Sequence, residues 1–476
     1  MQRVLIANHL NTYFTGLLPL ALMLKQSSQF EPVVLFSRVY PTSLADIITC
    51  KQQSLEVHLG KDVNKVLLPE IVKNKIMIDG KHNKYEILLK SPLILINRVF
   101  TRIFTNGFLL EIMKIYKKIR NIRQLIRTER ISLIVLPANN RYDFSVFVHA
   151  AHQEKIGVVL VPQFMAGPLE WAEHVKDKRS YQSKNIVNRL AGYLFPKWSL
   201  QYKGRKLLAL PGAQIFAHEL FGIAPPSPWV LHSGMADAVA VESDAIRSYC
   251  LKEGLPSEKI HVTGSITQDH MFRFMSDTEQ KRTILNGELG FALDQPLILS
   301  ALPCDMLYTN RTECDFQEYE KLLEFWCKTI SSIEGYNHVV ALHPSVCFDD
   351  MKYIEKFGLK IIKESTASII PLCDIYVASI SSTIQWAIAC CKPVINYDVY
   401  RYHYTDYQNA EGVITIYEQK DFLYFLKKLT SDYNYLSKIT NKQLESKKNW
   451  GIIDGMASER LKKLFDSIIK CYQEAV

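Results

Sequence analysis

The chain has 476 residues, which is too long for one ordinary hydrophobic core and predicts two domains. Its composition, 48% hydrophobic and 22% charged without a repeat or low-complexity block, excludes a disordered or fibrous protein. No apolar run reaches the roughly 18 residues of a membrane-spanning helix, and Asn8, His9 and Asn11 interrupt the apolar start, unlike a signal peptide. We therefore expect a cytoplasmic protein.

Short apolar, β-branched runs alternate with helix-like stretches along the chain, which is the pattern of βαβ units in a parallel sheet. The runs form two series, and each series predicts one doubly wound, Rossmann-like sheet, so that two α/β lobes would face one another across a cleft. The predicted strands of the first series are residues 3–7, 31–36, 132–137, 157–162, 238–243 and 259–264. Those of the second series are residues 296–302, 338–344, 359–363, 374–379, 392–397 and 412–416.

The boundary between the two series is expected near residue 266. Residues 1–265 would form the N-terminal domain, with an irregular insertion at about 61–105, and residues 266–450 the C-terminal domain. Residues 451–476 read as a helix that can cross back to the first lobe. Because open parallel sheets bind ligands beyond the carboxyl ends of their strands, the residues that follow each strand are the candidates for a site.

The net charge of +9 is concentrated in residues 114–130 and residues 176–206. Both stretches mix Lys and Arg with large apolar residues, as a helix lying on anionic lipid does. A solvated helix face explains the first stretch slightly better, whereas aromatic residues in the second favour peripheral contact with the inner membrane face or an acceptor. No recognised nucleic-acid-binding module accompanies the charge, so we expect no nucleic-acid partner.

The predicted strand 338–344 ends in His343-Pro344-Ser345. A histidine at the carboxyl edge of a sheet can donate a hydrogen bond to a phosphate oxygen or protonate a leaving phosphate. Pro344 would end the strand and fix the turn that directs the imidazole. A single histidine at the end of a strand is more often structural, so this motif alone does not establish a site.

The predicted strand 374–379 is followed by the hydroxyl run Ser381-Ser382-Thr383 and then by a helix-like stretch. Hydroxyls and free N–H groups at the start of a helix favour a bound anion. A helix cap explains one of the three residues but not all of them. The run therefore predicts a phosphate-binding loop on the same sheet as His343.

The first strand-to-helix turn of the second series, Pro303-Cys304-Asp305, is placed to approach the same phosphate. It lacks the glycines of a dinucleotide-binding turn, and the chain contains no Walker-type Gly-Lys-Ser/Thr run. Both observations disfavour hydride transfer and nucleoside triphosphate hydrolysis.

The order strand, His-Pro, strand, Ser-Ser-Thr, helix, Lys-Pro-Val-Ile resembles the donor lobe of GT-B glycosyltransferases. It is most similar to bacterial enzymes with CMP-activated donors, such as sialyltransferases, Kdo transferases and polyglycerol-phosphate polymerases. The resemblance implies that the second domain binds the nucleotide sugar, with its phosphate on His343, Ser381 and Ser382, and that the first domain binds the acceptor. The segment VTGSITQD (262–269) is also similar to the lobe junction of non-hydrolysing UDP-GlcNAc 2-epimerases, which share the GT-B architecture.

Two departures from these families narrow the prediction. Many UDP-sugar GT-B enzymes carry a glutamate at the start of the helix after the serine loop, where this chain has Gln385-Trp386. The missing acid favours a CMP donor over a UDP donor. The acidic catalytic residue of the epimerases is missing from VPQFMAG (161–167), which makes epimerisation a minority interpretation.

An inverting transfer requires a carboxylate or imidazole that takes a proton from the attacking hydroxyl. Glu170, which follows a strand and the turn Gly167-Pro168, is the first candidate, and Asp143 is the second. Either acid could instead cap or solvate a helix.

Further candidates lie on the acceptor side of the first domain. His9 and Asn11 occupy the polar turn after the first strand, a position that commonly faces a ligand. Arg141 could pair with a carboxylate of the acceptor or donor, and equally with Asp143.

We expect no metal and no cofactor. The ten cysteines form no C-x-x-C pair and no metal-type spacing with histidine, so they are expected to be reduced core residues. No Asp-x-Asp pair ends a strand, and Asp349-Asp350 reads as a helix start. The resemblance agrees, because GT-B enzymes generally neutralise the leaving phosphate with protein groups.

Together these features predict a metal-independent glycosyltransferase. It would move a sugar, preferably a CMP-activated acidic sugar such as Kdo or a nonulosonic acid, to a glycan or lipid-linked glycan of a bacterial lipopolysaccharide or capsule. Three alternatives stay open: a UDP-sugar transferase or 2-epimerase on the same fold, a CMP-linked glycerol-phosphate-type transferase, and a non-catalytic member of a polysaccharide biosynthesis complex.

Overall fold

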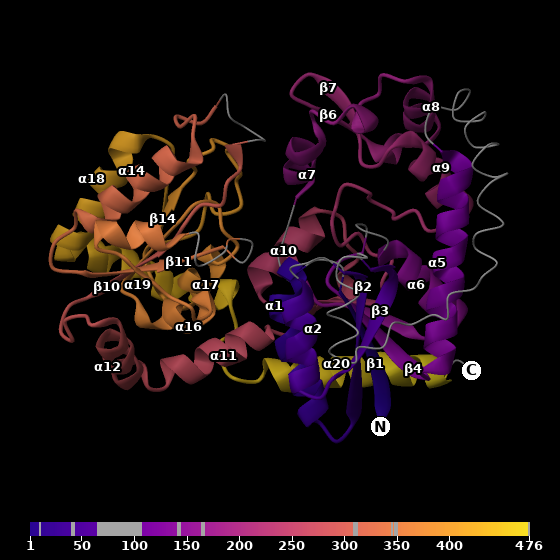
Figure 1. Cartoon of the computed structure of the whole chain (residues 1–476), viewed down its shortest axis with the longest axis horizontal. Helices are drawn as coiled ribbons and strands as arrows, with labels where there is room; N and C mark the ends of the chain where they lie inside the picture. Colours follow the sequence, from indigo (N-terminus) through magenta and orange to yellow (C-terminus); the bar gives the residue numbers. More distant parts are fainter. Residues whose placement is uncertain are drawn as a thin grey trace. The chain divides into compact units, whose positions relative to one another are not determined.

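The computed structural model divides into two compact units, which we call the first and the second lobe (Figure 1). The first lobe comprises residues 1–241, 247–261 and 461–476, and the second lobe comprises residues 242–246 and 262–460. The residues described are 1–8, 11–39, 43–63, 107–139, 144–162, 167–307, 313–343, 346 and 351–474, without the side chains of 11–15, 38, 39, 43, 44 and 61–63.

The first lobe is built on a seven-stranded sheet in the order β3-β2-β1-β4-β5-β8-β9, and the pairs from β3 to β8 are parallel. Leu133 to Leu136 of β4 are all fully buried, because helices cover both faces of a parallel sheet. The strands are β1 Gln2–Asn8, β2 Phe30–Val39, β3 Glu56–Val63, β4 Ile131–Leu136, β5 Gly157–Leu160, β8 Ala238–Val241 and β9 Ile260–Val262.

The long helix α5 of the first lobe buries one apolar stripe. In α5, Ile115, Ile119, Ile122 and Ile126 are buried, and their spacing of three or four residues places them on one face. This helix takes up most of the basic stretch 114–130. The helices are α1 Asn11–Gln26, α2 Ser43–Gln52, α5 Phe108–Thr128, α6 Phe144–Gln153 and α10 Asp244–Lys252, of which α10 begins in the second lobe.

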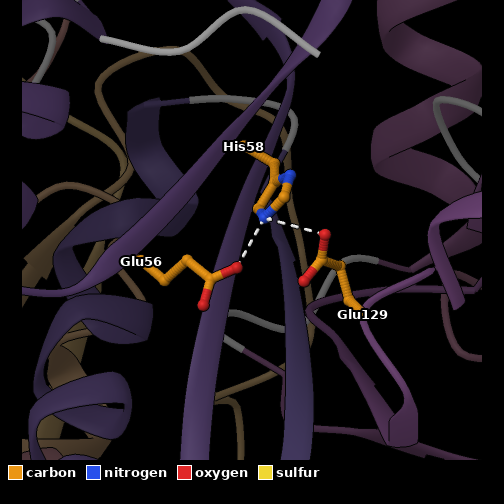
Figure 2. A group of neighbouring side chains, drawn as sticks. All are labelled: Glu56, His58 and Glu129. Atoms are coloured by element: carbon orange, nitrogen blue, oxygen red, sulfur yellow. Dashed lines mark hydrogen bonds and ion pairs between the residues drawn. The ribbon is translucent and has the colours of Figure 1, made fainter. Parts of the chain in front are cut away.

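A cluster of charged side chains ties strands together at the amino edge of this sheet (Figure 2). The His58 Nε2 atom lies 2.7 Å from Glu56 Oε1 and 3.9 Å from Glu129 Oε1. Burial opposes ionisation of Glu56, but hydrogen bonds from His58 and Arg3 outweigh it and lower the pKa of that carboxyl. Two carboxylates and an imidazole can bind a metal. Here the Arg3 guanidinium donates hydrogen bonds to both carboxylates, at 2.6 Å to Glu129, and its positive charge balances theirs.

An insertion between β5 and β8 forms a separate layer with its own core (Figure 1). Its centre is Trp198, whose indole N–H donates to Glu219 Oε1 at 2.6 Å and whose carbonyl accepts from the Trp229 indole at 3.0 Å. Because it follows β5, it continues from the carboxyl edge of the first-lobe sheet. Its elements are α7 Pro168–Val175, η3 Arg179–Tyr181, α8 Ile186–Leu194, η4 Pro196–Trp198, the hairpin β6 Ser199–Tyr202 and β7 Arg205–Leu208, and α9 Gly212–Leu220.

The C-terminal helix α20 (Ala457–Glu474) contributes its residues from Leu461 onward to the first lobe. Phe465 packs edge-on against Phe30 with ring centroids 6.3 Å apart, and the Tyr472 hydroxyl donates to Asp237 Oδ1 at 2.9 Å. A Cβ atom at Gly157 would overlap α20 side chains, so the helix lies closely on β5. The helix is part of the core of the first lobe.

The second lobe is built on a six-stranded sheet in the order β12-β11-β10-β13-β14-β15, with every pair parallel. The strands are β10 Leu297–Ala301, β11 Asn337–Ala341, β12 Lys360–Ile361, β13 Ile375–Ala378, β14 Val394–Tyr397 and β15 Val413–Ile416. The helical elements are α11 Ile266–Met275, α12 Thr278–Leu289, α14 Tyr319–Ser331, η6 Lys352–Phe357, α16 Thr366–Ile369, η7 Ile370–Leu372, α17 Ile384–Ala389, α18 Gln419–Ser431 and α19 Tyr433–Trp450.

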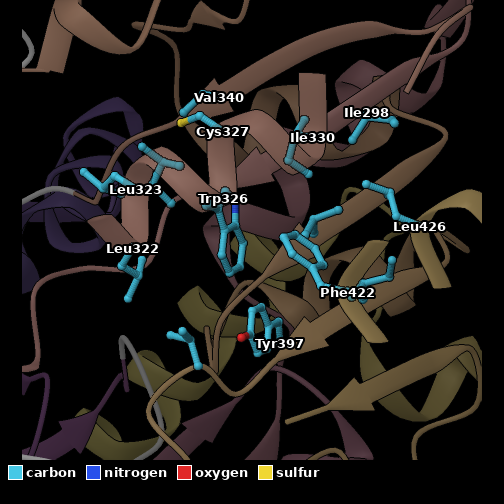
Figure 3. Close-up of a cluster of buried hydrophobic side chains, with 14 of the residues drawn as sticks. Ile298, Leu322, Leu323, Trp326, Cys327, Ile330, Val340, Tyr397, Phe422 and Leu426 are labelled. Carbon is cyan, nitrogen blue, oxygen red and sulfur yellow. The ribbon is translucent and has the colours of Figure 1, made fainter. Parts of the chain in front are cut away.

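Successive residues of the β10 strand feed two separate cores, one on each face of the second-lobe sheet. Ile298 belongs to the core under α14 and α18, and Leu299 to the core on the other face. In the first core Trp326 stacks on Tyr397 with ring centroids 5.7 Å apart, and Phe422 packs against both (Figure 3).

The segment 262–269 organises the start of the helices α11 and α20. Ser265 and Gln268 form a capping box at the start of α11. The carboxylate of Asp269 accepts hydrogen bonds from the backbone N–H groups of Ala457 and Ser458 at 2.9 and 2.8 Å. It therefore caps the N-terminus of α20, where a negative charge is favourable.

The prediction of two Rossmann-like α/β lobes is confirmed, and every predicted strand is present within a few residues. The chain divides after residue 261, slightly before the boundary expected near 266, and residues 242–246 belong to the second lobe. The strand β3 extends to Val63 into the stretch expected to be irregular, and residues 64–106 lie outside the described residues. Across the described parts of the chain, no helix has the length and apolar character needed to cross a membrane.

Candidate functional site

Three polar segments follow neighbouring strands of the second-lobe sheet. The strands β11, β10 and β13 are adjacent and parallel, and they are followed by His343, residues 303–305 and residues 381–383. Because the carboxyl ends of parallel strands lie at one edge, the structure brings these segments to the same end of the sheet. Pro344 and Ser345 lie outside the described residues.

Two tyrosines, the partly buried Tyr319 and the buried Tyr400, fix the loop after β10. The Tyr319 hydroxyl donates to the Pro303 carbonyl at 2.7 Å, and the Tyr400 hydroxyl donates to the Cys304 carbonyl at 2.5 Å. Burial raises the pKa of both phenols, so they act as neutral donors. Asp305 accepts a bond from the backbone two residues ahead. The loop is thus held in one conformation before any ligand arrives.

The hydroxyl run after β13 is joined to the sheet by a short chain of hydrogen bonds. Thr383 Oγ1 lies 2.5 Å from the Tyr376 hydroxyl and 2.7 Å from Ser381 Oγ. The Tyr407 hydroxyl donates to the Ser381 carbonyl at 3.1 Å. Ser381 and Thr383 are only partly buried, so they keep surface through which an anion can be reached. The chain of bonds orients their hydroxyls in advance.

The backbone of this loop is strained at the residue that precedes the hydroxyls. Ile380 has a φ angle of +47°, a left-handed conformation that is unfavourable for a β-branched side chain. A hydrogen bond of 2.9 Å from its N–H to Asn396 Oδ1 stabilises this conformation. The helix that follows, α17, has only six residues, and the N–H of Ile384 bonds to the Ser381 carbonyl. The side-chain hydroxyls, rather than a long helix dipole, therefore provide the donors of this loop.

His343 stands just beyond β11 as an exposed residue. The surrounding protein still removes water from one side of the imidazole, and this desolvation lowers its pKa. Its carbonyl accepts a bond of 2.9 Å from the Val346 N–H, which closes a turn after the strand. The lowered pKa favours the neutral imidazole, whose N–H group can donate a hydrogen bond to a phosphate oxygen.

Sequence reasoning missed an acid that reaches the start of α17. Glu242, at the end of β8, accepts hydrogen bonds from the Gln385 amide, the Trp386 indole at 3.3 Å and the Ser265 hydroxyl at 3.0 Å. Desolvation raises the pKa of this carboxyl, although the three donors oppose the shift.

Gln385 and Trp386 stand where the resemblance implies a glutamate in UDP-sugar enzymes. A carboxylate, that of Glu242, nevertheless lies next to this position, and it comes 143 positions earlier than Gln385. The preference for a CMP donor over a UDP donor, which rested on the absence of an acid at 385–386, therefore stays a prediction. The signal was visible in the sequence, because Glu242 is the next-to-last residue of the predicted strand 238–243.

Among the candidates in the first lobe, Glu170 is the one whose side chain is described. The carboxylate of Glu170 accepts from the Gly167 N–H in a capping box at the start of α7, which gives it a structural role whether or not it also takes a proton. Asp143, Arg141 and His9 lie outside the described residues, and only the backbone of Asn11 is described, in the first turn of α1.

Two buried asparagines mark the carboxyl edge of the first-lobe sheet. Asn8 ends β1 and Asn139 follows the adjacent strand β4, and they are 1% and 0% exposed. Among the described residues, Asn8 Oδ1 and both polar side-chain atoms of Asn139 have no hydrogen-bond partner. Buried polar groups are normally bonded, so these amides are positions where ordered water or a polar ligand is expected.

The fold and the polar edge of its second sheet define a two-lobed α/β protein with a loop cluster suited to an anion. No family model matches the sequence, and no curated protein matches it. Solved structures do match. The UDP-GlcNAc 2-epimerase from Neisseria meningitidis bound to UDP-GlcNAc aligns with a TM-score of 0.50 and 12% identity, over 98% of this chain and 100% of that chain.

The UDP-N-acetylglucosamine 2-epimerase from Rickettsia bellii aligns with a TM-score of 0.50 and 11% identity over 100% of this chain and 99% of that chain. A glycosyltransferase from Rickettsia africae aligns with a TM-score of 0.47 and 11% identity over 98% and 99%. At this level of identity the first two likenesses show a shared fold. The chain therefore has the two-lobed GT-B architecture.

Proposed function

We propose that the protein is a metal-independent glycosyltransferase that uses a nucleotide sugar. The observation that carries the proposal is the arrangement of His343, residues 303–305 and residues 381–383 at the carboxyl ends of three adjacent strands. Open α/β sheets bind nucleotides at this edge. The shared GT-B fold supports the proposal, because a structure of that fold is described as bound to UDP-GlcNAc.

The proposed reaction is an attack of an acceptor hydroxyl on the anomeric carbon of the donor. The bond from that carbon to the phosphate oxygen breaks, and negative charge develops on the departing nucleotide. Ser381 and Thr383 would donate hydrogen bonds to its phosphate, and His343 would stabilise or protonate it. Glu170, or Asp143 in second place, would take the proton of the attacking hydroxyl.

For the donor we propose a pyrimidine nucleotide sugar. The sequence favours a CMP-linked acidic sugar, and the fold relatives that are described as UDP-GlcNAc 2-epimerases favour a UDP-linked one. A carboxylate such as Glu242, close to the start of α17, can accept bonds from the ribose hydroxyls that both nucleotides share. For the acceptor we propose a glycan or lipid-linked glycan, bound near Asn8 and Asn139.

A thermal-shift screen of CMP, UDP, GDP and their sugars tests the nucleotide site. A nucleotide that binds only the folded protein raises the melting temperature by mass action. We expect CMP or UDP to stabilise the wild type, and Ser381→Ala to weaken that binding about tenfold through loss of a hydrogen bond to an anion. Ser431→Ala, on the exposed end of α18, is the matched control and should bind like the wild type. If no nucleotide stabilises the protein, it is a non-catalytic member of a biosynthetic complex and the proposal is wrong.

Glu170→Gln tests the proposed base. Glutamine at this position of a capping box can still accept the Gly167 N–H bond, so the melting temperature should stay nearly unchanged. Turnover should fall about a hundredfold or more if the carboxylate takes the proton. Unchanged turnover would leave Glu170 as a helix cap and move the role to Asp143.

A second candidate function, 2-epimerisation of a UDP sugar, is favoured by the shared fold with two epimerase structures. Nuclear magnetic resonance of UDP-GlcNAc incubated with the protein and no acceptor distinguishes the two. Epimerisation inverts the configuration at C2 without releasing nucleotide, whereas transfer requires an acceptor and releases the nucleotide. Product mass separates sugar transfer from transfer of a glycerol-phosphate group.

A further inference from the structure

The helix α8 is fixed in the insertion layer by its buried side. Asn188 donates to the carbonyls of Ser180 and Gln182 at 2.9 and 2.8 Å and accepts from the Gly212 N–H at 2.8 Å. A Cβ atom at Gly192 would press on side chains of the β6–β7 hairpin, so the helix approaches it closely. The rotation of α8 about its own axis is therefore determined.

This rotation turns an apolar stripe outward. Ile186, Leu190, Tyr193 and Leu194 follow one another at helical spacing and are 76%, 50%, 79% and 50% exposed. Single exposed apolar residues are ordinary on a protein surface, but a continuous stripe on one helix marks a contact surface. We call these four side chains the α8 stripe.

The surroundings of the stripe are strongly basic. Residues 176–206 contain nine Lys and Arg and one acid, Asp177, a net +8 within a chain of net +9. Arg179, Lys184 and Lys206 are exposed and form no ion pair with any described residue. Exposed cations in the segment that carries an apolar stripe complement a surface that is both anionic and apolar.

We propose that the α8 stripe and its basic surroundings dock the protein on an anionic lipid bilayer. The four apolar side chains would enter the boundary between headgroups and acyl chains, with the Tyr193 ring at the interface, and the cations would contact lipid phosphates. A second copy of the chain fits less well, because it would place two basic segments against each other.

The position of the insertion gives this docking a consequence. The insertion continues from the carboxyl end of β5, at the same sheet edge as Asn8 and Asn139. Docking through α8 would bring this edge of the first lobe towards lipid headgroups. If the proposed function holds, a lipid-linked acceptor would be presented there, but the docking itself does not depend on the reaction.

Vesicle flotation of the full chain tests the proposal. We expect the wild type to float with phosphatidylcholine vesicles containing about one-third phosphatidylglycerol and not with pure phosphatidylcholine. Salt at about 0.5 M should release much of the bound protein, because it screens the charges. The double variants Ile186→Ser/Tyr193→Ser and Lys184→Glu/Arg189→Glu should each lower the floated fraction at least about fivefold.

Matched controls lie in the second lobe. Leu444→Ser removes an apolar side chain that is 54% exposed on α19, and Lys438→Glu reverses an exposed charge on the same helix. Both should float like the wild type, and all variants should keep the wild-type melting temperature. The proposal is overturned if the wild type ignores anionic vesicles or if the controls lose binding equally. It is also overturned if light scattering shows that the stripe variants only convert a dimer into monomers.

Discussion

The two sheets differ at their carboxyl edges in how their polar groups are satisfied. In the second lobe, tyrosine hydroxyls orient the loop carbonyls at 303–304 and the hydroxyls of Ser381 and Thr383. In the first lobe, the buried amides of Asn8 and Asn139 keep atoms without partners among the described residues. One sheet edge is therefore organised before a ligand binds, whereas the other keeps buried polar groups that no described residue satisfies.

The largest expected effect lies at the organised edge. His343→Ala should lower turnover at least about a hundredfold, since it removes a group that stabilises or protonates the leaving phosphate. The melting temperature should hardly change, because the residue is exposed. Steady-state kinetics and a melting curve on the same preparation check this. Full turnover in the variant would show that the organised edge does not carry the chemistry.

Thr383→Val examines the hydrogen-bond chain itself. Valine keeps the shape of threonine but leaves the fully buried Tyr376 side chain without this hydroxyl partner, which should reduce the free energy of unfolding by about 1–3 kcal/mol. Denaturant unfolding measures the loss, and Thr383→Ser should recover most of it. Equal stability of all three proteins would mean that the edge is not pre-organised by this chain.

Glu242→Gln tests whether burial or hydrogen bonding decides the pKa of the carboxyl near the start of α17. The pKa of Glu242 is raised in the folded protein, so as the pH increases the carboxyl ionises in the unfolded chain before it ionises in the folded one. The wild type therefore loses stability from the unfolded-state pKa up to the folded-state pKa. Glutamine does not titrate, so the melting temperature of the variant relative to the wild type should rise as the pH increases above about 4, the usual pKa of a glutamate side chain. A relative melting temperature that falls over this range would show that the three donors hold the carboxylate ionised.

The smallest effect on stability is expected at the unsatisfied edge. Asn139→Leu replaces a buried amide that has no partner among the described residues with an apolar group of similar size, so the free energy of unfolding should stay the same or rise by up to about 1 kcal/mol. The KM for the acceptor should increase if the amide binds it. A clear loss of stability would reveal that ordered water already satisfies Asn139, and the contrast between the two edges would disappear.

The sequence predicted the strands because each is a short apolar run between polar stretches. The runs also fixed which residues follow a strand, so that His343, residues 303–305 and residues 381–383 were correctly expected at one sheet. The edge strand β3 was missed, since Glu56 and His58 alternate with apolar residues and give no continuous buried run.

Contacts between distant positions were not predictable in the same way. The Tyr376 hydroxyl bonds to Thr383 in the loop after its strand, and the sequence of a buried strand does not show which other segment a side chain reaches.

The two basic stretches show the same limit. In α5 the apolar residues are buried and Arg123 and Arg127 pair with Glu154, whereas α8 exposes its apolar stripe. Patterns of charge alone cannot distinguish these arrangements.

The helix α20 has a consequence for how the chain acquires its structure. Its residues from Leu461 onward complete the core of the first lobe, and Asp269 of the second lobe caps its start. The ribosome therefore produces the last piece of the first lobe only after the whole second lobe has been made. Until then, the surface around Phe30 and Gly157 that α20 covers is exposed, and the nascent first lobe should need chaperone protection.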